Sequence, residues 1–191
     1  MRKNIGLLFG SFNPIHIGHI ALANYILEYS ELSEIWFIVS PQNPFKDESE
    51  LIPESFRYQM VQMAIADELR FKVSDIEFHL PKPSYTINTL EKLVGEYPEF
   101  NFTIIIGSDN LIALNEWKNV DKIFQLVDFI VYPRPEYPID KTSALLKTTI
   151  INAPLLDISS TMIRKAIKEN RKLQYFLPKG AYGFIVENKL F

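Results

Sequence analysis

The sequence of 191 residues predicts an α/β protein with a Rossmann-like, doubly wound parallel sheet, helices on both faces and a helical C-terminal appendage. Two observations favour this class. Short apolar runs alternate with longer stretches of helical period, which is typical of βαβ units. The apolar runs are also nearly continuous, as expected for strands that are covered on both faces. We expect residues 1–191 to form a single domain with a helical subregion at about 159–191.

The expected strands are the short apolar runs, and they lie at residues 4–9, 34–39, 71–76, 102–106, 129–132 and 149–151. The expected helices lie at residues 17–29, 53–68, 86–96, 110–126 and 160–170, and a last helix begins after Pro178. Pro53 is expected in the first turn of its helix, where its missing N–H costs no hydrogen bond. Loops 41–51 and 133–141 are the expected places for flexible substrate-binding residues.

Composition excludes several classes of protein. The chain has no cysteine, which excludes disulfides, thiolate zinc sites and cysteine nucleophiles. Its formal net charge of −3 argues against a nucleic-acid-binding protein. No apolar run approaches the roughly 18 residues that a membrane span needs, and residues 5–12 lack the cleavage site of a signal peptide. We therefore expect a soluble, cytoplasmic protein without nucleic-acid or membrane partners.

The most informative segment spans residues 10–19 and reads GSFNPIHIGH. It joins the first expected strand to the first expected helix, and parallel sheets bind ligands at the carboxyl ends of their strands. A helix N-terminus there favours an anion such as phosphate, and Gly10 and Gly18 would let the backbone approach one closely. His16 and His19 can project to one side as neutral donors, because a helix N-terminus disfavours a protonated histidine. On the residues alone, a turn with two buried histidines is the alternative.

This segment resembles the G-x-F-x-P-x-H-x-G-H signature of the nucleotidyltransferase superfamily and, more narrowly, that of bacterial nicotinate-nucleotide adenylyltransferases. Residues 16–19 also match the HIGH motif of class I aminoacyl-tRNA synthetases, but the chain is too short to include a tRNA-reading body. The resemblance implies that ATP is bound by Gly10, Ser11, Phe12, His16 and His19. It also implies that the two histidines act in catalysis.

A second segment, residues 158–164, reads ISSTMIR. Serine before an amphipathic run predicts a helix N-cap, and Arg164 then lies one turn inside the helix. Taken alone, this segment is more typical of an ordinary capped helix with a solvated arginine. It resembles the I-S-S-T-x-I-R signature of the same superfamily, which implies that Ser159, Ser160, Thr161 and Arg164 contact the ATP phosphates and that Arg164 is catalytic. No lysine-rich loop of the synthetase type is present.

Two segments between these motifs resemble the part of the family pattern that handles the pyridine nucleotide. Lys46 lies in a P-F-K sequence that resembles P-P-H-K, with Phe45 in place of histidine. Residues 83–89 read PSYTINT and resemble P-S-Y-T-x-D-T, with asparagine at 88 in place of aspartate. The resemblance implies that Lys46, Tyr85 and Thr86 bind nicotinate mononucleotide and that Lys46 also acts in catalysis. Helix capping is the simpler interpretation of residues 83–89.

Residues 107–109 follow the fourth expected strand, which we expect to lie beside the first. They resemble the family's G-x-D and imply that Gly107 and Asp109 line the ATP site, with Asp109 near a ribose. Trp117 matches a family tryptophan that stacks on the nicotinate ring. Arg57 and Arg134 match the family pattern too, without a role that the sequence assigns.

The resemblance implies adenylyl transfer from ATP to nicotinate mononucleotide, with release of pyrophosphate, in NAD biosynthesis. The attacking phosphate is already an anion, so the rate would come from positioning and electrostatic stabilisation by His16, His19, Lys46 and Arg164. Mg²⁺ is expected to bridge phosphate oxygens, held by ATP and water without a protein ligand. The alternatives are the same chemistry on nicotinamide mononucleotide, phosphopantetheine or FMN, or a nucleotide-binding module without catalysis. A homo-oligomer is left open.

Overall fold

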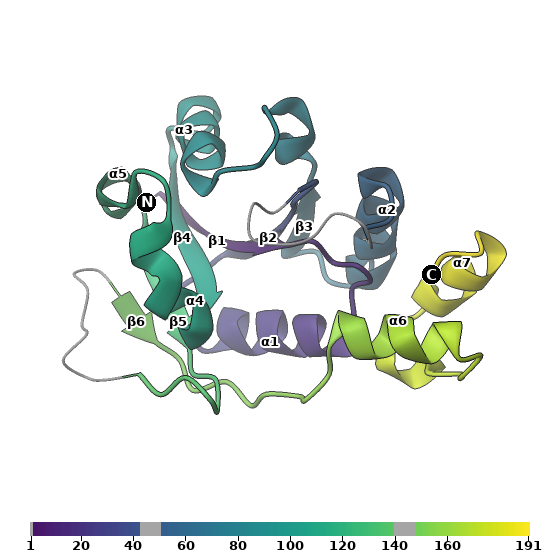
Figure 1. Ribbon diagram of the computed structural model, residues 1–191. Coiled ribbons are helices and arrows are strands. Elements are labelled where there is room, and N and C mark those ends of the chain that lie inside the picture. Colours follow the sequence, from purple (N-terminus) through teal and green to yellow (C-terminus); the bar gives the residue numbers. More distant parts are fainter. Residues whose placement is uncertain (1, 43–50, 140–147) are drawn as a thin grey trace.

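The computed structural model describes residues 2–42, 51–139 and 148–191, and its centre is a six-stranded sheet (Figure 1). The strand order is β3-β2-β1-β4-β5-β6, and every neighbouring pair is parallel. This order is that of a Rossmann-like, doubly wound sheet, so the predicted fold class is confirmed. The strands are β1 Lys3–Gly10, β2 Glu34–Val39, β3 Phe71–Ser74, β4 Phe100–Gly107, β5 Asp128–Tyr132 and β6 Thr148–Ile150.

The helices follow the predicted order, and the structure corrects three details of the predicted helices and strands. They are α1 Ile17–Glu28, α2 Glu54–Ile65, α3 Thr86–Glu96, α4 Ser108–Ile112, α5 Val120–Leu126, α6 Ser160–Lys168 and α7 Ala181–Glu187, with 3₁₀ turns η1 Ile76–His79, η2 Ala113–Glu116 and η4 Gln174–Phe176. The single helix predicted at 110–126 is wrong, because Trp117 is extended and Asn119 adopts a left-handed φ of 56°. The strand predicted at 71–76 ends at Ser74, where η1 takes over. Pro53 is the residue before α2 rather than part of its first turn.

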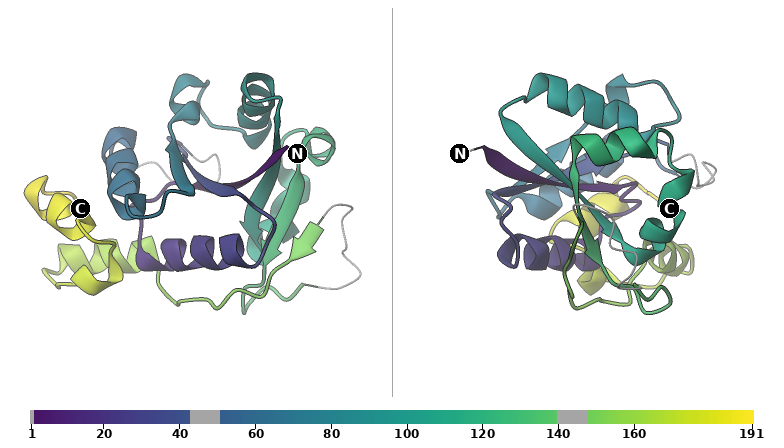
Figure 2. Two further views of the ribbon diagram at one scale, coloured as in Figure 1. Left: turned by 180° about the vertical axis from the view of Figure 1, so that it is seen from behind. Right: turned by 90° about the vertical axis from the view of Figure 1, so that its left-hand side faces the viewer.

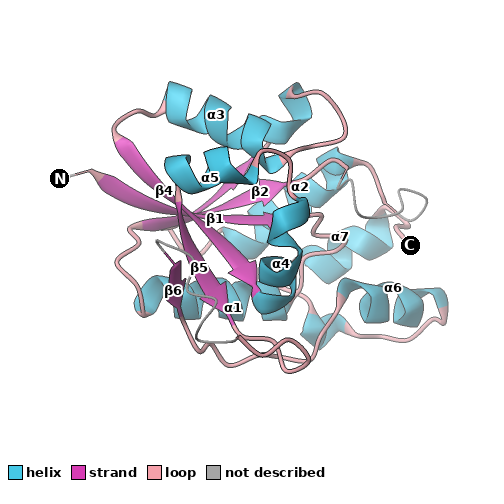
Figure 3. Cartoon of the chain, turned by 60° about the vertical axis from the view of Figure 1, so that its left-hand side comes forward, coloured by secondary structure: helices cyan, strands magenta, loops and turns pink. Residues whose placement is uncertain are grey.

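Helices cover both faces of the sheet, and each face has its own hydrophobic core (Figures 2 and 3). On one face, α1 and α2 pack against residues such as Leu8 and Phe37. On the other face, α3 and α5 pack against residues such as Leu7 and Phe129. The near-continuous apolar strands therefore supply side chains to two cores at once, as strands buried on both faces must.

The C-terminal helices belong to the core on the α1 and α2 face. Ile163 of α6, and Ala181 and Ile185 of α7, are all at most 1% exposed and join the cluster that contains Leu8 and Phe37. Figure 1 shows α6 beside the beginning of α1. This packing brings the second sequence motif close to the first. No helix in the described part of the chain is long and apolar enough to cross a membrane.

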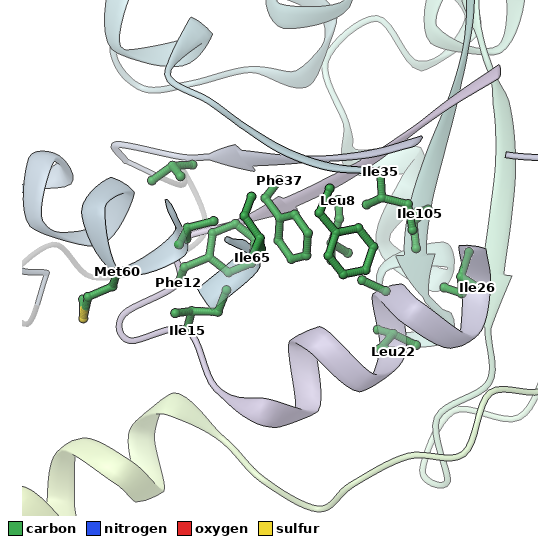
Figure 4. Close-up of a cluster of buried hydrophobic side chains, with 14 of the residues drawn as sticks. Leu8, Phe12, Ile15, Leu22, Ile26, Ile35, Phe37, Met60, Ile65 and Ile105 are labelled. Atoms are coloured by element: carbon green, nitrogen blue, oxygen red, sulfur yellow. The ribbon is translucent and has the colours of Figure 1, made fainter. Parts of the chain in front are cut away.

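Phe37 lies at the centre of the core on the α1 and α2 face (Figure 4), and we expect its removal to be costly. It is fully buried, and its ring centroid lies 5.7 Å from that of Phe12 and 5.4 Å from that of Phe71. Phe37→Ala should lower the free energy of unfolding by about 3–5 kcal/mol, because it removes apolar contacts and leaves a cavity. Urea unfolding measures the change. Leu69→Ala, at a position that is 83% exposed, is the control and should change it by less than about 0.5 kcal/mol. Equal effects of the two substitutions would contradict this assignment of the core.

Candidate active site

The carboxyl ends of β1 and β4 lie side by side at the centre of the sheet. The two strands pair in parallel, with Leu8 opposite Ile105, which confirms the predicted pairing. From this point the strand order runs outward in both directions, which makes it the topological switch point at which parallel α/β sheets bind ligands. The segments 10–19 and 107–109 meet here, as predicted.

His16 and His19 form a stacked pair at the beginning of α1. Their ring centroids are 3.7 Å apart, with an angle of 27° between the ring planes. The backbone N–H of His16 donates to Nδ1 of His19 over 3.2 Å, and the backbone N–H of His19 donates to the carbonyl oxygen of His16 over 3.0 Å. Because Nδ1 of His19 accepts, the ring proton of neutral His19 lies on Nε2, which makes Nε2 a donor.

His16 is neutral at physiological pH. Burial, and to a smaller extent the positive charge of Arg134, lower its pKa to about 4. His16 is only 6% exposed, so water does not stabilise the charged form of its imidazole. The neutral state expected at the helix N-terminus is therefore supported for His16, and its role as a donor to phosphate stays a prediction.

Gly10 and Gly18 make room for rings of the protein itself. A Cβ at Gly18 would lie 3.0 Å from Nδ1 of His16, and a Cβ at Gly10 would lie 2.8 Å from the ring of Phe12. Phe12 is 2% exposed and takes a left-handed φ of 45°, which turns its ring into the core. Its ring is therefore not available to a ligand, and any ATP contact of Phe12 must come from its backbone. Glycine at these two positions of the motif therefore leaves space for the rings of Phe12 and His16.

The second motif is attached to the first by hydrogen bonds across about 150 positions of the chain. Ser160 donates its hydroxyl to the carbonyl oxygen of Pro14 over 2.8 Å, and Nη1 of Arg164 donates to the carbonyl oxygen of Asn13 over 3.0 Å. Ser159 is the N-cap of α6, as predicted, and accepts from the backbone N–H of Met162. The guanidinium of Arg164 thus lies against the loop that precedes the two histidines.

Asp109 and Arg134 form an ion pair at the end of β4. Nε of Arg134 lies 3.3 Å from Oδ1 of Asp109, and Nη2 donates to the hydroxyl of Tyr132 over 3.1 Å. A Cβ at Gly107 would lie 2.3 Å from Oδ1 of Asp109 and 2.8 Å from Nε of Arg134, so this pair requires glycine there. Asp109 lies in the first turn of α4, after the N-cap Gly107. Arg134 is thereby placed at the same edge as the histidines.

The sequence analysis assigned no role to Arg57, although this residue matches the family pattern. It is 1% exposed, and it donates to the carbonyl oxygens of Ser11, Ser40, Pro41 and Ile52 over 2.6–3.0 Å. Burial lowers its pKa to about 10, so it keeps its charge at pH 7. Arg57 therefore joins the loop after β1 to the loop after β2 and is structural.

Tyr85, Thr86 and Trp117 lie on the face of the sheet that carries α3. Tyr85 is the N-cap of α3, without a side-chain hydrogen bond to the helix, and Thr86 is its first residue. Tyr85 and Trp117 are partly buried against the same hydrophobic cluster. Nζ of Lys118, the neighbour of Trp117, lies 4.4 Å from the ring centroid of Tyr85. The segments 83–89 and 117–118 therefore meet, whereas Lys46 lies outside the described residues.

Glu77 is a residue that the sequence reasoning missed. It is 2% exposed on η1, and its Oε1 accepts from the hydroxyl of Thr89 on α3 over 2.8 Å. Burial raises its pKa, and the hydroxyls of Thr89, Ser40 and Ser84 partly oppose that rise. The backbone N–H of Ser84 also donates to the carbonyl oxygen of Gln42. The carboxyl of Glu77 thus lies where the loop after β2 meets the beginning of α3.

The donor set suits a polyphosphate. Imidazole N–H, hydroxyl and guanidinium groups from the two motifs face one sheet edge at which a helix begins, and such groups bind phosphate oxygens. Among the described residues, no group of three or more histidine, aspartate and glutamate side chains is placed to hold a metal ion. A Mg²⁺ ion that arrives with a nucleotide fits this donor set, because the phosphates then supply its ligands.

Comparisons with known proteins show the family to which the chain belongs. The cytidylyltransferase-like family model matches residues 7–166. Probable nicotinate-nucleotide adenylyltransferases of Bacteroides fragilis and Bacteroides thetaiotaomicron are 47% and 46% identical, cover 97% and 95% of this chain, and are themselves covered over 92% and 90%. The structure of the Plasmodium falciparum nicotinic acid mononucleotide adenylyltransferase complexed with NaAD has a TM-score of 0.82 at 24% identity, and 98% of this chain and 97% of that one are covered.

The burial of Glu77 gives a testable pH dependence. Because burial raises the pKa of Glu77, the folded protein holds the carboxyl proton more tightly than the unfolded chain does. Ionisation of Glu77 at higher pH therefore lowers the free energy of unfolding. Relative to the native chain, Glu77→Gln should become progressively more stable as the pH rises above the ordinary carboxyl pKa. Urea unfolding between about pH 5 and 8 measures the difference. Glu31→Gln, at an exposed position, is the control. Parallel stability curves for Glu77→Gln and the native chain would contradict the prediction.

Proposed function

Because the chain belongs to the cytidylyltransferase-like family and, within it, to the nicotinate-nucleotide adenylyltransferases, we propose that it transfers the adenylyl group of ATP to nicotinate mononucleotide. The products are nicotinate adenine dinucleotide and pyrophosphate, which places the reaction in NAD biosynthesis. The observation that carries this proposal is the attachment of Ser160 and Arg164 to the loop before His16 and His19. It assembles phosphate-binding groups from both ends of the chain at one edge of the sheet.

The proposed ATP site lies at the carboxyl ends of β1 and β4. Its phosphates meet the beginning of α1, the ring of His19 and the guanidinium of Arg164. Ser159, Ser160 and Thr161 approach from α6, and Gly10, Ser11, Phe12, Gly107 and Asp109 line the nucleoside side. In this arrangement residues 1–191 work as one nucleotidyltransferase domain, with 159–191 as its helical subregion.

Nicotinate mononucleotide is proposed to lie beside α3, with its ring near Tyr85, Thr86 and Trp117. Its phosphate is the nucleophile and attacks the α-phosphorus of ATP, forming the new P–O bond as the bond to pyrophosphate breaks. This phosphate is already an anion, so no general base is required. Neutral His16 and His19 donate hydrogen bonds without demanding a counter-charge, while Lys46 and Arg164 supply positive charge to the leaving pyrophosphate.

Mg²⁺ is proposed as the companion of ATP, where it neutralises charge on the phosphates. Among the described residues, no group of three or more histidine, aspartate and glutamate side chains could hold the ion, so phosphate oxygens and water would supply its ligands. Because ATP is an intracellular metabolite, we propose the cytoplasm as the place of action.

The proposed function is tested by pyrophosphate release from ATP and Mg²⁺, with nicotinate mononucleotide and nicotinamide mononucleotide assayed in parallel. We expect rapid release with the acid and slower release with the amide. Release with neither, despite measurable ATP binding, would contradict the proposed function. Assays with phosphopantetheine and FMN would then follow, and inactivity with both would indicate a nucleotide-binding module.

His19→Ala should lower kcat by about 100-fold, because it removes a donor that is aimed at developing charge in the transition state. Its effect on the Kd for ATP should stay within about threefold, since other donors bind the ground state. Steady-state pyrophosphate release and calorimetric ATP titration measure the two quantities. His79→Ala, at an exposed histidine on η1, is the control. A loss confined to ATP affinity would overturn the catalytic role of His19.

A further inference from the structure

Positive charge is concentrated in the C-terminal part of the chain. Residues 159–191 contain seven lysines and arginines and two glutamates, which gives a formal net charge of +5. Residues 1–158 contain 13 lysines and arginines and 21 aspartates and glutamates, which gives −8. Five of the C-terminal cations are exposed between α6 and the beginning of α7, and we call them the cationic segment: Lys165, Lys168, Arg171, Lys172 and Lys179.

The cationic segment differs from the rest of the chain in its ion pairs. Lys82 pairs with Glu54, and Lys122 pairs with Glu91. Lys168 apart, no residue of the segment has a carboxylate oxygen within 4.0 Å of its charged nitrogens in the ranges 2–42, 51–139 and 148–191. Within the described chain, the charge of the segment is therefore available to act on anions in the solvent.

Helix stability explains only part of this charge. Lys165 and Lys168 lie in the last turn of α6, where cations complement the helix dipole. Arg171 and Lys172 lie beyond the end of that helix, and Lys179 comes directly before the N-cap of α7. The N-terminus of a helix disfavours positive charge, so Lys179 does not stabilise α7. The segment therefore carries more positive charge than its two helices require.

The cationic segment begins at the proposed ATP site. The same helix, α6, holds Ser160 and Arg164 against the loop before the two histidines, and Lys165 is the next residue. A helix rises by about 1.5 Å per residue, so Lys168 lies roughly 12 Å along α6 from Ser160. Figure 1 shows α6 running outward from the beginning of α1 toward α7. An anion that approaches this edge of the sheet therefore meets the positive part of an otherwise acidic protein.

The ionic strength of the solvent decides how far this positive charge acts. The Debye length is about 30 Å at 0.01 M and about 8 Å at 0.15 M. The cationic segment can thus act on a nucleotide at the site in dilute salt, and concentrated salt screens most of its effect. Charge of this kind raises the local concentration of an anion and its rate of encounter without touching the bound ligand.

We propose that the cationic segment is an electrostatic guide that attracts polyanionic nucleotides, ATP above all, to the phosphate-binding edge of the sheet. This inference rests on the proposed adenylyl transfer and explains how a protein of net negative charge attracts a polyanionic substrate. The guide acts on the approach and binding of ATP, so it changes kcat/KM and the Kd for ATP and leaves kcat unchanged. Because the attraction is proportional to the charge of the ligand, it is absent for uncharged adenosine.

The test compares the native chain with a variant that combines Lys165→Gln, Arg171→Gln and Lys172→Gln. At an ionic strength of about 0.01 M, the Kd for ATP from calorimetric titration should rise about fivefold, and kcat/KM for ATP should fall by a similar factor. At about 0.5 M, both quantities should agree with the native values within about 1.5-fold, because salt screens the charges. The Kd for adenosine should stay within about 1.5-fold of the native value at both ionic strengths.

A second variant, with Arg2→Gln, Lys3→Gln and Lys72→Gln, is the control. It makes the same change in net charge at exposed positions near the amino ends of β1 and β3. This edge of the sheet lies opposite the proposed site, so the Kd for ATP at low ionic strength should stay within about twofold of the native value.

Equal ATP affinities of the first variant and the native chain at low ionic strength would overturn the proposal. A loss of affinity that persists at 0.5 M, or that extends to adenosine, would overturn it too, because a long-range charge effect is screened by salt and acts only on ions. A matching Tm shows that the first variant is folded. Calorimetric titration needs no turnover, so a native chain that binds ATP without releasing pyrophosphate would contradict the proposed function alone, and the two failures are distinguishable.

Discussion

The buried guanidinium of Arg57 holds together the two loops from which the site is built. It donates four hydrogen bonds to backbone carbonyls, two of them in the loop after β2 and one in the loop after β1. A buried arginine keeps its charge only when such acceptors surround it, and removing it would leave buried carbonyls unpaired. The position of Ser11, and with it the course of the chain to His16, therefore depends on a residue that lies on α2.

The loop after β1 also shows how the structure prepares a backbone for an anion. Carbonyl oxygens would repel phosphate, and in this loop those of Ser11, Asn13 and Pro14 accept hydrogen bonds from Arg57, Arg164 and Ser160. The partial negative charges of the loop are thus directed toward donors of the protein. The loop leads to the beginning of α1 and to the ring of His19, and a helix N-terminus and an imidazole donor suit a phosphate.

The two sides of the site use charge in different ways. Near the proposed ATP phosphates, burial keeps the pKa of His16 near 4, so this ring of the stacked pair is neutral at pH 7. On the proposed pyridine side, a lysine ammonium rests on an aromatic ring at the beginning of a helix. Between them, the buried carboxyl of Glu77 ties η1 to α3 and so fixes where that helix begins. Burial lowers the pKa of the His16 imidazole and raises that of the Glu77 carboxyl, and in both groups it favours the neutral form.

The sequence by itself determined the parallel α/β class, the bounds of α3, the N-cap Ser159 and the pairing of β1 with β4, because these follow from local periodicity, capping chemistry and chain order. The family resemblance implied that the two motifs act on one ligand, and the hydrogen bonds of Ser160 and Arg164 to the loop before His16 join them in the structure. Only the tertiary structure decided the break between α4 and α5, the packing role of the glycines and the burial of Glu77. Arg57 is the clearest case. It lies in a predicted helix, and the carbonyl groups that bury it lie 5 to 46 positions away in the sequence. Contacts over such separations leave no periodic signal in a single sequence, so they are read only from the folded chain.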